Sequence, residues 1–364
     1  KDKLMKKLSI LADENIPNLK VLCADWANIT TKLGRDISSS DLIGIDILFV
    51  RSVTKVNAEL LAKADLKFVG SATIGVDHID TDYLASQGIG FAHAPGSNAN
   101  GVVDYVMSVI LDHYDNASLE NLTVGVLGHG NVGSRLARCL EHLSINHVIY
   151  DPLFSPSKKT KPPTDSPAHK FLDSVDDLMT SDIISAHVPL TSGVEDSTHH
   201  IFDSARLSQL VNNALFINSS RGPVVDNVAL KQLLLERSDL TVALDVWEGE
   251  PSIDLELYNL CDTATPHIAG YSLDGKLRGT EAIVTAALDY LNLESTLPSK
   301  NTALVILEDL KTIDDYREAL SLTYSAKKET ELFKRKISES NNIAQTFDAY
   351  RKSYPARKEI NYDR

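Results

Sequence analysis

The sequence predicts two doubly wound α/β domains with parallel sheets, followed by a small C-terminal appendage. Its 364 residues exceed the usual size of a single domain. Short apolar runs alternate with amphipathic segments in two successive series, which is the pattern of parallel strands covered by helices. We assign a first domain to residues 1–98 and 280–294, a second to residues 99–279, and the appendage to residues 295–364.

The first series occupies the N-terminal hundred residues. Strands are expected in the apolar runs KLSILAD, IDILFVR, LKFVGSA and GIGFAHA, and a helix in NAELLAKA at residues 57–64. A longer helix is expected over residues 98–114, where the chain passes into the second domain.

The second series begins near residue 122. Strands are expected in LTVGVLG, NHVIYD, DIISAHV, ALFINSS, LTVALDV and CDTATPH. A helix over residues 280–293 then returns the chain to the first domain. Residues 155–169 are rich in Pro, Ser and Lys but lie between a predicted strand and a predicted helix, so we interpret them as a surface loop.

Beyond residue 295 the chain becomes charged and helical, without further βα alternation. Leu304, Leu307 and Leu310 recur at helical spacing on a segment too short to bury a large core alone. We therefore expect the appendage to pack against a partner.

Composition excludes several classes of function. A formal net charge of -14 disfavours nucleic-acid binding, which needs clustered Lys and Arg. The three cysteines show no CxxC spacing, which argues against disulfides and a zinc site. The adjacent His199 and His200 are expected to point apart without an acidic partner, so we expect no metal site. With no apolar run of membrane-spanning length and no signal peptide, a cytoplasmic protein without membrane contact is predicted.

A glycine motif follows the first strand of the second series. In VGVLGHGNVGSRLARCLEHL, Gly128, Gly130 and Gly133 form GxGxxG between a strand and an amphipathic helix. Such glycines permit a tight turn, approach of a pyrophosphate and close helix packing, which predicts a Rossmann-like dinucleotide site. Asp151 ends the next strand, where its carboxylate accepts hydrogen bonds from a ribose and repels a 2'-phosphate. The motif therefore favours NAD over NADP.

Polar residues also follow the other strands of the second series. In a doubly wound sheet the carboxyl ends of the strands gather at the ligand. Arg221, Glu250 and His267 follow three successive strands, so we expect them to converge beside the nicotinamide. Each alone is typical of an ordinary loop; their joint placement favours function.

The blocks NSSRGPVVD, LDVWEGEP and TPHIAGY, with the glycine loop, resemble the D-2-hydroxyacid dehydrogenase family. The resemblance implies an NAD-dependent enzyme in which His267 takes the proton from the C2 hydroxyl of the substrate. It implies that Glu250 orients and stabilises this histidine, and that Arg221 holds the substrate carboxylate and the C2 oxygen.

Further blocks narrow the resemblance, including ADENIP, VRSVTKVN, GSATIGVDHID and APGSNA. They imply a small phosphorylated 2-hydroxy acid, 4-phospho-D-erythronate, as the substrate, and a homodimer. Substrate contacts are implied at Ser52, Thr73 and Tyr271. The positions that match cofactor contacts, beyond the three glycines and Asp151, are Asn131, Val132, Val188, Ser219, Ser220, Arg221, Asp245 and Gly270.

Recognition of the phosphate requires cations that Arg221 does not supply. Lys276 and Arg278 follow the His267 loop, and we expect them to bind the phosphate. Arg51 and Lys55, which flank Ser52, and the basic tail around Arg351 and Lys352 are the alternatives.

Alternatives remain open. The chain fits a related dehydrogenase for another 2-hydroxy acid, such as 3-phosphoglycerate, although its tail lacks a βαββαβ regulatory pattern. It also fits a non-enzymatic NAD-binding protein that resembles a corepressor, or a fold with a decayed site. Val188 stands where a Thr is common and Ser97 where a Cys is often found.

Overall fold

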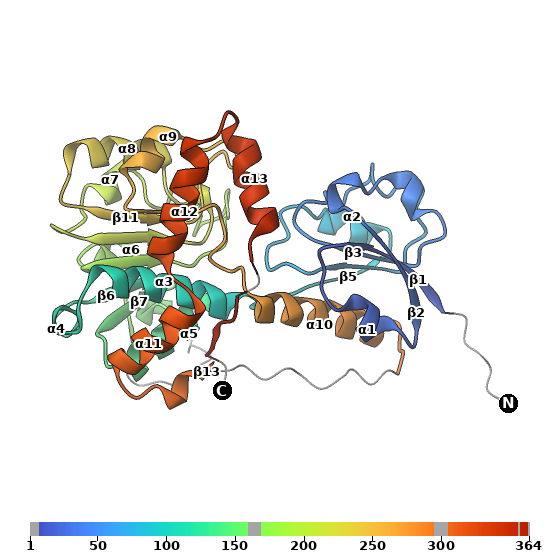
Figure 1. Cartoon of the computed structure of the whole chain (residues 1–364), viewed down its shortest axis with the longest axis horizontal. Helices are drawn as coiled ribbons and strands as arrows, with labels where there is room; N and C mark the ends of the chain where they lie inside the picture. The colour runs from blue at the N-terminus through green and yellow to red at the C-terminus, as the bar shows by residue number, and fades with distance from the viewer. Residues whose placement is uncertain (1–6, 159–168, 295–304, 356, 363–364) are drawn as a thin grey trace. The chain divides into compact units, whose positions relative to one another are not determined.

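The computed structural model describes residues 7–158, 169–294, 305–355 and 357–362, which form two compact units. Unit one comprises Lys1–Asn98 and Leu273–Thr302, and unit two comprises Ala99–Ser272 and Ala303–Arg364. Both are α/β units, as the sequence predicted (Figure 1).

Unit one contains a five-stranded parallel sheet of order β2-β1-β3-β4-β5. Its elements are β1 (Leu8–Asp13), α1 (Leu19–Cys23), β2 (Ala27–Lys32), β3 (Ile47–Val50), β4 (Phe68–Ser71), α2 (Thr81–Ser86), β5 (Gly90–His93) and α10 (Leu273–Tyr290). Alternate residues of β1 serve the two faces: Ile10 packs in a cluster with Ile283 of α10, and Leu11 packs in a cluster with Leu84 of α2. Each face of the sheet is therefore buried, which explains its nearly continuous apolar strands.

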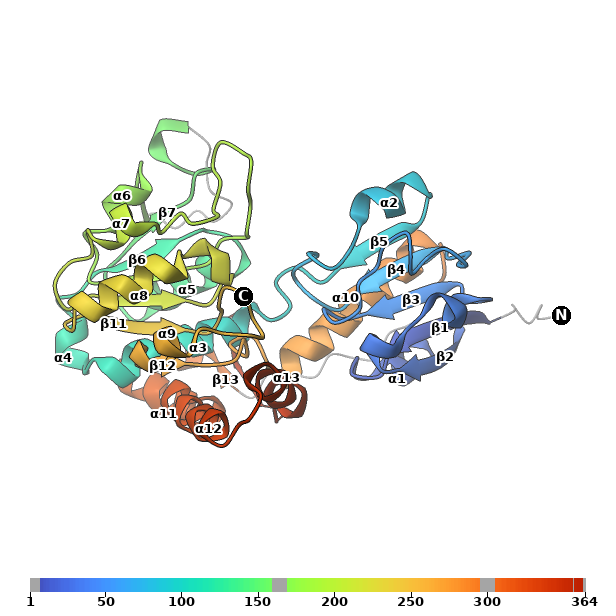
Figure 2. The same ribbon diagram turned by 90° about the horizontal axis from the view of Figure 1, so that it is seen from above.

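Unit two contains a seven-stranded parallel sheet of order β12-β11-β10-β9-β6-β7-β8. Its strands are β6 (Val124–Leu127), β7 (His147–Tyr150), β8 (Lys170–Phe171), β9 (Ile183–Ala186), β10 (Leu215–Asn218), β11 (Thr241–Leu244) and β12 (Thr263–Ala264). The strand order reverses at β6, between β7 and β9, which makes the carboxyl end of β6 the expected ligand position. Figure 2 labels β6 and its neighbour β7 in this sheet.

Helices cover both faces of this sheet. They are α3 (Ala99–His113), α4 (Asn116–Leu119), α5 (Asn131–His142), α6 (Val175–Leu178), α7 (Ser204–Leu207), α8 (Asn227–Glu236) and α9 (Leu255–Leu260). Residues of α3 and α5 share one core cluster, whereas α6 to α9 belong to the cluster on the opposite face.

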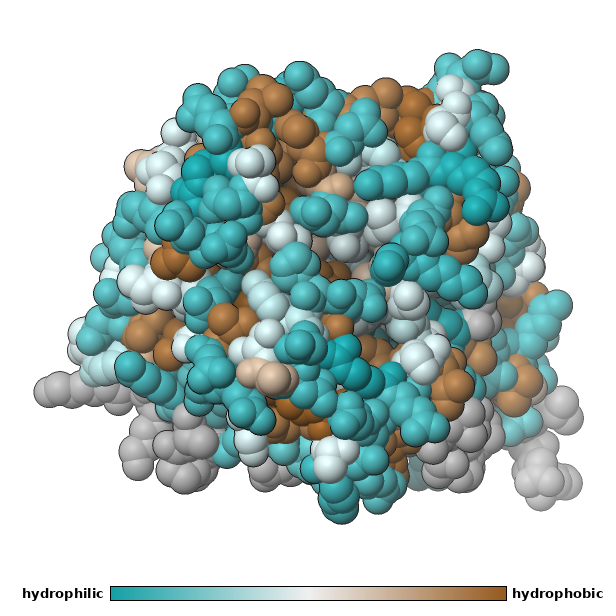
Figure 3. All heavy atoms as spheres, turned by 60° about the vertical axis from the view of Figure 1, so that its left-hand side comes forward, coloured by the Kyte–Doolittle hydropathy of each residue, from teal (hydrophilic) through white to brown (hydrophobic). Residues whose placement is uncertain are grey.

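The C-terminal region packs onto unit two. It consists of β13 (Val305–Ile306), α11 (Ile313–Thr323), α12 (Ala326–Ser338), α13 (Ile343–Ser353) and β14 (Ile360–Asn361), drawn in orange and red in Figure 1. Leu307 and Leu310 lie in the same core cluster as α3 and α5, while Leu304 falls outside the described residues. Apolar residues of this region are therefore buried within their own chain. On the face shown in Figure 3, apolar residues lie in small patches between hydrophilic ones.

Several expectations about local structure need correction. Residues 57–64 form turns rather than a helix. The Leu61 N–H donates to the carbonyl oxygen four residues before it, that of Asn57, whereas the Ala64 N–H donates to the one three residues before it, that of Leu61, so the α-helical pattern of hydrogen bonds does not continue. The helix expected at residues 280–293 begins seven residues earlier, at Leu273, and ends at Tyr290. The sequence did not reveal β2, β8, β13 or β14.

Other expectations fared differently. Cys23, Cys139 and Cys261 are free and buried. Most of the loop at residues 155–169 lies outside the described residues. Within the described ranges, the helices lack the length and apolar character needed to cross a membrane.

Candidate active site

The glycine loop joins β6 to α5 at the point where the strand order reverses. Gly128 has φ +90°, and a Cβ there would lie 2.8 Å from the carbonyl oxygen of His187. A Cβ on Gly133 would lie 1.9 Å from the carbonyl oxygen of Gly128, so only glycine lets α5 approach this closely. A Cβ on Gly130 would have no atom of the described residues within 4 Å. The open space over Gly130, beside the N-terminus of α5, fits a pyrophosphate.

Asp151 follows β7 and supports this loop. Its Oδ2 accepts a hydrogen bond of 2.8 Å from the backbone N–H of His129, and its Oδ1 accepts one of 2.9 Å from that of Leu153. The carboxylate is half-buried, with lone pairs remaining for a ribose hydroxyl. Asn131 and Val132, which open α5, remain accessible.

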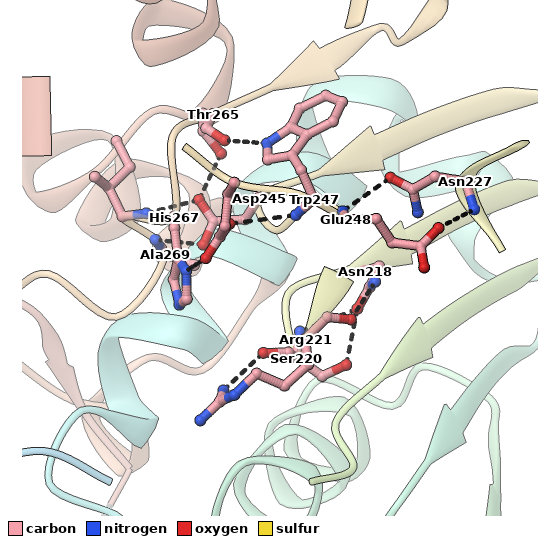
Figure 4. A network of polar contacts seen from close by, with 12 residues as sticks. Asn218, Ser220, Arg221, Asn227, Asp245, Trp247, Glu248, Thr265, His267 and Ala269 are labelled. Carbon is pink, nitrogen blue, oxygen red and sulfur yellow. Dashed lines mark hydrogen bonds and ion pairs between the residues drawn. The ribbon is translucent and has the colours of Figure 1, made fainter. Parts of the chain in front are cut away.

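The loop after β10 carries Arg221 and is organised by Asn218, a residue that sequence analysis overlooked. The Asn218 Oδ1 accepts hydrogen bonds from the Ser220 N–H and Oγ, at 3.1 and 2.8 Å. Its Nδ2 donates to the Arg221 carbonyl oxygen at 3.0 Å (Figure 4). The Ser219 Oγ is buried without a partner among the described residues, and Val188 is buried beside Gly128. An orphaned hydroxyl at this position fits a bound polar cofactor.

Gly222 brings the Arg221 loop against the loop after β11. A Cβ on Gly222 would lie 2.1 Å from both the C and O atoms of Trp247 and 2.5 Å from the N atom of Glu248. Two backbones can approach so closely only where a side chain is absent. Gly222 thus places Arg221 beside the segment that leads to Glu250.

Asp245 fixes the loop that carries His267. Its Oδ1 accepts hydrogen bonds from the Ile268 N–H and Thr265 Oγ1, at 2.8 and 2.7 Å, and its Oδ2 accepts one from the Ala269 N–H at 2.9 Å. Its backbone oxygen accepts the His267 N–H at 2.7 Å. The residue is buried, so the structure gives it a role in holding the loop, in addition to the cofactor contact expected from the sequence.

His267 and Glu250 are brought into direct contact. The Nδ1 of His267 lies 2.5 Å from Oε1 of Glu250. His267 has φ +56°, a left-handed conformation uncommon outside glycine, which the bonds of Asp245 maintain. With Nδ1–H donating to the carboxylate, neutral His267 keeps Nε2 as a proton acceptor.

Glu250 is held in its ionised form. Burial opposes ionisation, but the charge of His267 when it is protonated, its hydrogen bond, the charge of Arg351 and the Trp247 N–H lower the pKa of Glu250 below its usual value. The Trp247 N–H donates to Oε2 of Glu250 at 3.3 Å. The site therefore couples a carboxylate to an imidazole, the arrangement used to orient a general base.

The predicted substrate residues divide between the units. Ser52 is exposed, and the Thr73 Oγ1 donates to the Gly75 carbonyl oxygen at 2.9 Å. The Nη2 and Nε of Arg278 donate to the Ser97 carbonyl oxygen at 2.7 and 3.1 Å. Burial and then the charge of Arg51 lower the pKa of Lys276. These residues belong to unit one, whereas Tyr271 and Gly270 belong to unit two.

The expectation about His199 and His200 was wrong in its geometry. Their rings stack at a centroid distance of 4.1 Å, and His200 Nε2 lies 2.7 Å from Oε1 of Glu248. Potential metal-ligand atoms of these three residues lie within 4.8 Å of one another. His200 has φ +51°, which turns the two adjacent rings to the same side. Oε2 of Glu248 also accepts the Asn227 N–H at 2.9 Å, so this carboxylate links two loops.

Comparison with known proteins agrees with this geometry. A model of the D-isomer-specific 2-hydroxyacid dehydrogenase NAD-binding domain matches residues 107–269. Proteins named erythronate-4-phosphate dehydrogenase are similar over nearly their whole length. The one from Pseudomonas putida strain W619 is 41% identical over 361 residues, covering 96% of this chain and 93% of that protein. The one from Chromohalobacter salexigens is 40% identical, covering 97% and 92%.

Solved structures share the fold. D-lactate dehydrogenase from Aquifex aeolicus, in complex with NAD and lactic acid, has a TM-score of 0.62 at 25% identity, covering 78% of this chain and 95% of that one. The NAD-bound 3-phosphoglycerate dehydrogenase of Entamoeba histolytica has a TM-score of 0.65 at 20% identity, covering 82% and 100%. This chain therefore belongs to the D-2-hydroxyacid dehydrogenase family and is an NAD-dependent oxidoreductase.

Proposed function

We propose that this chain oxidises 4-phospho-D-erythronate at C2 to (R)-3-hydroxy-2-oxo-4-phosphobutanoate, a step of vitamin B6 biosynthesis. The observation that carries the proposal is the similarity to proteins named erythronate-4-phosphate dehydrogenase, at 41% identity over 96% of the chain. The contact between His267 and Glu250 supports an active catalyst rather than a corepressor-like protein or a decayed site.

In the proposed mechanism, neutral His267 is the general base. Its Nε2 receives the proton of the C2 hydroxyl, and ionised Glu250 stabilises the imidazolium that forms. Bound NAD supplies the acceptor for the hydride that leaves C2. Arg221 binds the substrate carboxylate and the C2 oxygen through its planar guanidinium, which suits two parallel hydrogen bonds.

The residues of unit two that would hold NAD surround the glycine loop and the strand ends. Backbone N–H groups of α5 would meet the pyrophosphate, and Asp151 the ribose. The proposed contacts are Gly128, Gly130, Asn131, Val132, Gly133, Asp151, Val188, Ser219, Ser220, Arg221, Asp245 and Gly270.

We propose Ser52, Thr73, Tyr271, Lys276 and Arg278 as substrate contacts, with the phosphate bound mainly by Lys276. Lys276 and Arg51 are neighbouring cations in unit one, and a dianion relieves such repulsion. Arg278 also supports the backbone of Ser97. Lys276→Met should raise KM for the phosphorylated substrate and leave an unphosphorylated analogue unaffected; equal losses on both substrates would assign Lys276 a structural role.

Formation of NADH, followed by absorbance, tests the substrate. The purified protein is offered 4-phosphoerythronate, 3-phosphoglycerate and unphosphorylated 2-hydroxy acids. Preference for 4-phosphoerythronate is expected. A higher kcat/KM for 3-phosphoglycerate would replace the proposed substrate, whereas NADH binding without turnover of any acid would favour the corepressor-like alternative.

We further propose a homodimer that works in the cytoplasm and is formed through the C-terminal region. Leu322 of α11 exposes 81% of its surface, and the three free cysteines suit a reducing compartment. Light scattering should give about twice the chain mass of 39.9 kDa. A mass equal to that of one chain would contradict the dimer.

A further inference from the structure

We propose that Arg351, on the C-terminal helix α13, is a positioning residue of the active site that acts through Glu250 and Tyr271. The inference rests on the proposed roles of His267 and Glu250. It assigns the C-terminal region a part in catalysis, separate from any part in dimer formation.

The C-terminal region forms hydrogen bonds with the loop that carries His267. Nη2 of Arg357 donates to the Ala269 carbonyl oxygen at 2.7 Å, across 88 residues of sequence. The same guanidinium pairs with Asp104 at 3.4 Å and lies 4.2 Å from the centroid of the Tyr324 ring. Ser272, just beyond the loop, donates from its hydroxyl to the Glu359 carboxylate. The loop is thereby fixed to β14 and its approach.

Arg351 makes a further contact between the C-terminal region and the segment that carries the catalytic residues. Its guanidinium carbon lies 5.8 Å from the centroid of the Tyr271 ring, four residues beyond His267, within the range of a cation–π interaction. Tyr354, which follows α13, also packs against Tyr271, with a ring-centroid distance of 6.0 Å. The position of Tyr271 thus depends on α13.

Placing Arg351 here costs folding free energy, because one of its N–H donors is buried. Packing of the helix does not by itself require this cost. Its Nε is buried and has no hydrogen-bond partner among the described residues. A buried unsatisfied donor is typically unfavourable, and functional sites are where such donors are retained. Lys352, the next residue, is an exposed cation and bears no such cost.

The charge of Arg351 acts on the catalytic pair. The ionisable groups whose charges act on Arg351 are Glu250 and Asp245, which follow β11, and Tyr271 beyond the His267 loop, which also forms a hydrogen bond with it. Burial disfavours the charged form of Arg351, but Tyr271 and Glu250 together hold its pKa above the usual value. In return, Arg351 contributes to the low pKa of Glu250, after burial and His267. A cation here keeps Glu250 ionised as the acceptor for His267.

The region that provides Arg351 lies outside the residues matched by the family model, which ends at residue 269. The D-lactate dehydrogenase structure is matched over 95% of its own length but covers only 78% of this chain. The proteins named erythronate-4-phosphate dehydrogenase cover 96% of it. The inference therefore concerns the C-terminal region, which the fold shared by the family does not require.

The test compares Arg351→Met with Lys352→Met, which removes the same charge one residue away. In protein labelled at the Glu carboxyl carbons, the Glu250 resonance is assigned with Glu250→Gln and titrated by NMR without cofactor. Loss of Arg351 should move its titration to higher pH by about half a unit or more, because a nearby cation favours the carboxylate. Lys352→Met should leave it unchanged. Thermal unfolding monitors folding, and Arg351→Gln serves if the Met variant is unstable.

Kinetics provide the second readout. The acid limb of the kcat profile should move to higher pH in Arg351→Met and Arg351→Gln, whereas Arg351→Lys should restore it. An unchanged Glu250 titration in both neutral variants would overturn the proposal. The titration needs no substrate, so a wild-type protein inactive on 4-phosphoerythronate would refute the proposed substrate while leaving the role of Arg351 to be decided by NMR.

Discussion

Gly222→Ala is the substitution for which the structure gives the sharpest expectation. The added Cβ would lie 2.1 Å from Trp247 C and O, whereas ordinary contacts begin near 3.4 Å. The obstacle is backbone, not a movable side chain, so the two loops must part by about 1 Å. Misplacement of catalytic groups by that distance can cost about 100-fold in rate. Overpacking of this kind also costs about 1–3 kcal/mol of stability.

The assay separates catalysis from cofactor binding. For Gly222→Ala, kcat/KM for the 2-hydroxy acid should fall by about 100-fold, because Arg221 moves relative to Glu250. NADH binding, measured by fluorescence, should fall by a smaller factor than kcat/KM, since the displaced loops carry only part of the proposed NAD contacts and the glycine loop is a separate segment. Gly222→Ala with wild-type kcat/KM would refute the argument that close approach of these loops assembles the site.

Gly130→Ala is the matched control. Its Cβ would have no atom of the described residues within 4 Å, so the melting temperature should stay unchanged. The methyl group would instead occupy the space that fits the pyrophosphate, and NADH affinity should fall. Gly222→Ala is thus expected to lower mainly kcat/KM and stability, and Gly130→Ala to lower mainly NADH affinity.

Three further outcomes are expected. His267→Asn should lower kcat by about 100-fold or more, with NADH binding retained, and near-normal turnover would remove His267 from the catalytic role. Asp151→Ala should reduce the preference for NAD over NADP, and a wild-type protein that used both equally would contradict the role of Asp151. Burial lowers the pKa of His187 to about 3, whereas the unfolded chain binds this proton below a pH of about 6.5. The contribution of His187 to stability should therefore be complete above that pH and decline below it by about 1.4 kcal/mol per pH unit; His187→Gln should flatten the decline in urea unfolding, and an unchanged slope would refute the assignment.

Local patterns in the sequence were enough to predict much of the secondary structure of this protein. Apolar runs bounded by turn residues marked most strands of both sheets, because a strand buried on both faces needs a continuous apolar segment. The short edge strand β8 and the polar β2 carry too weak a pattern to be recognised. The glycine motif and Asp151 were readable because their spacing along one strand, turn and helix has a direct structural meaning. The order of strands was likewise enough to place Glu250 and His267 at one edge of the sheet.

The tertiary structure decided how that edge is assembled. Asn218 organises the Arg221 loop, and Asp245 holds the His267 loop through three hydrogen bonds to its carboxylate. Neither function is visible as a periodic pattern. The contacts of Arg351 and Arg357 join segments more than 75 residues apart. Such contacts depend on where helices and strands cross after folding, and sequence spacing carries no information about that crossing.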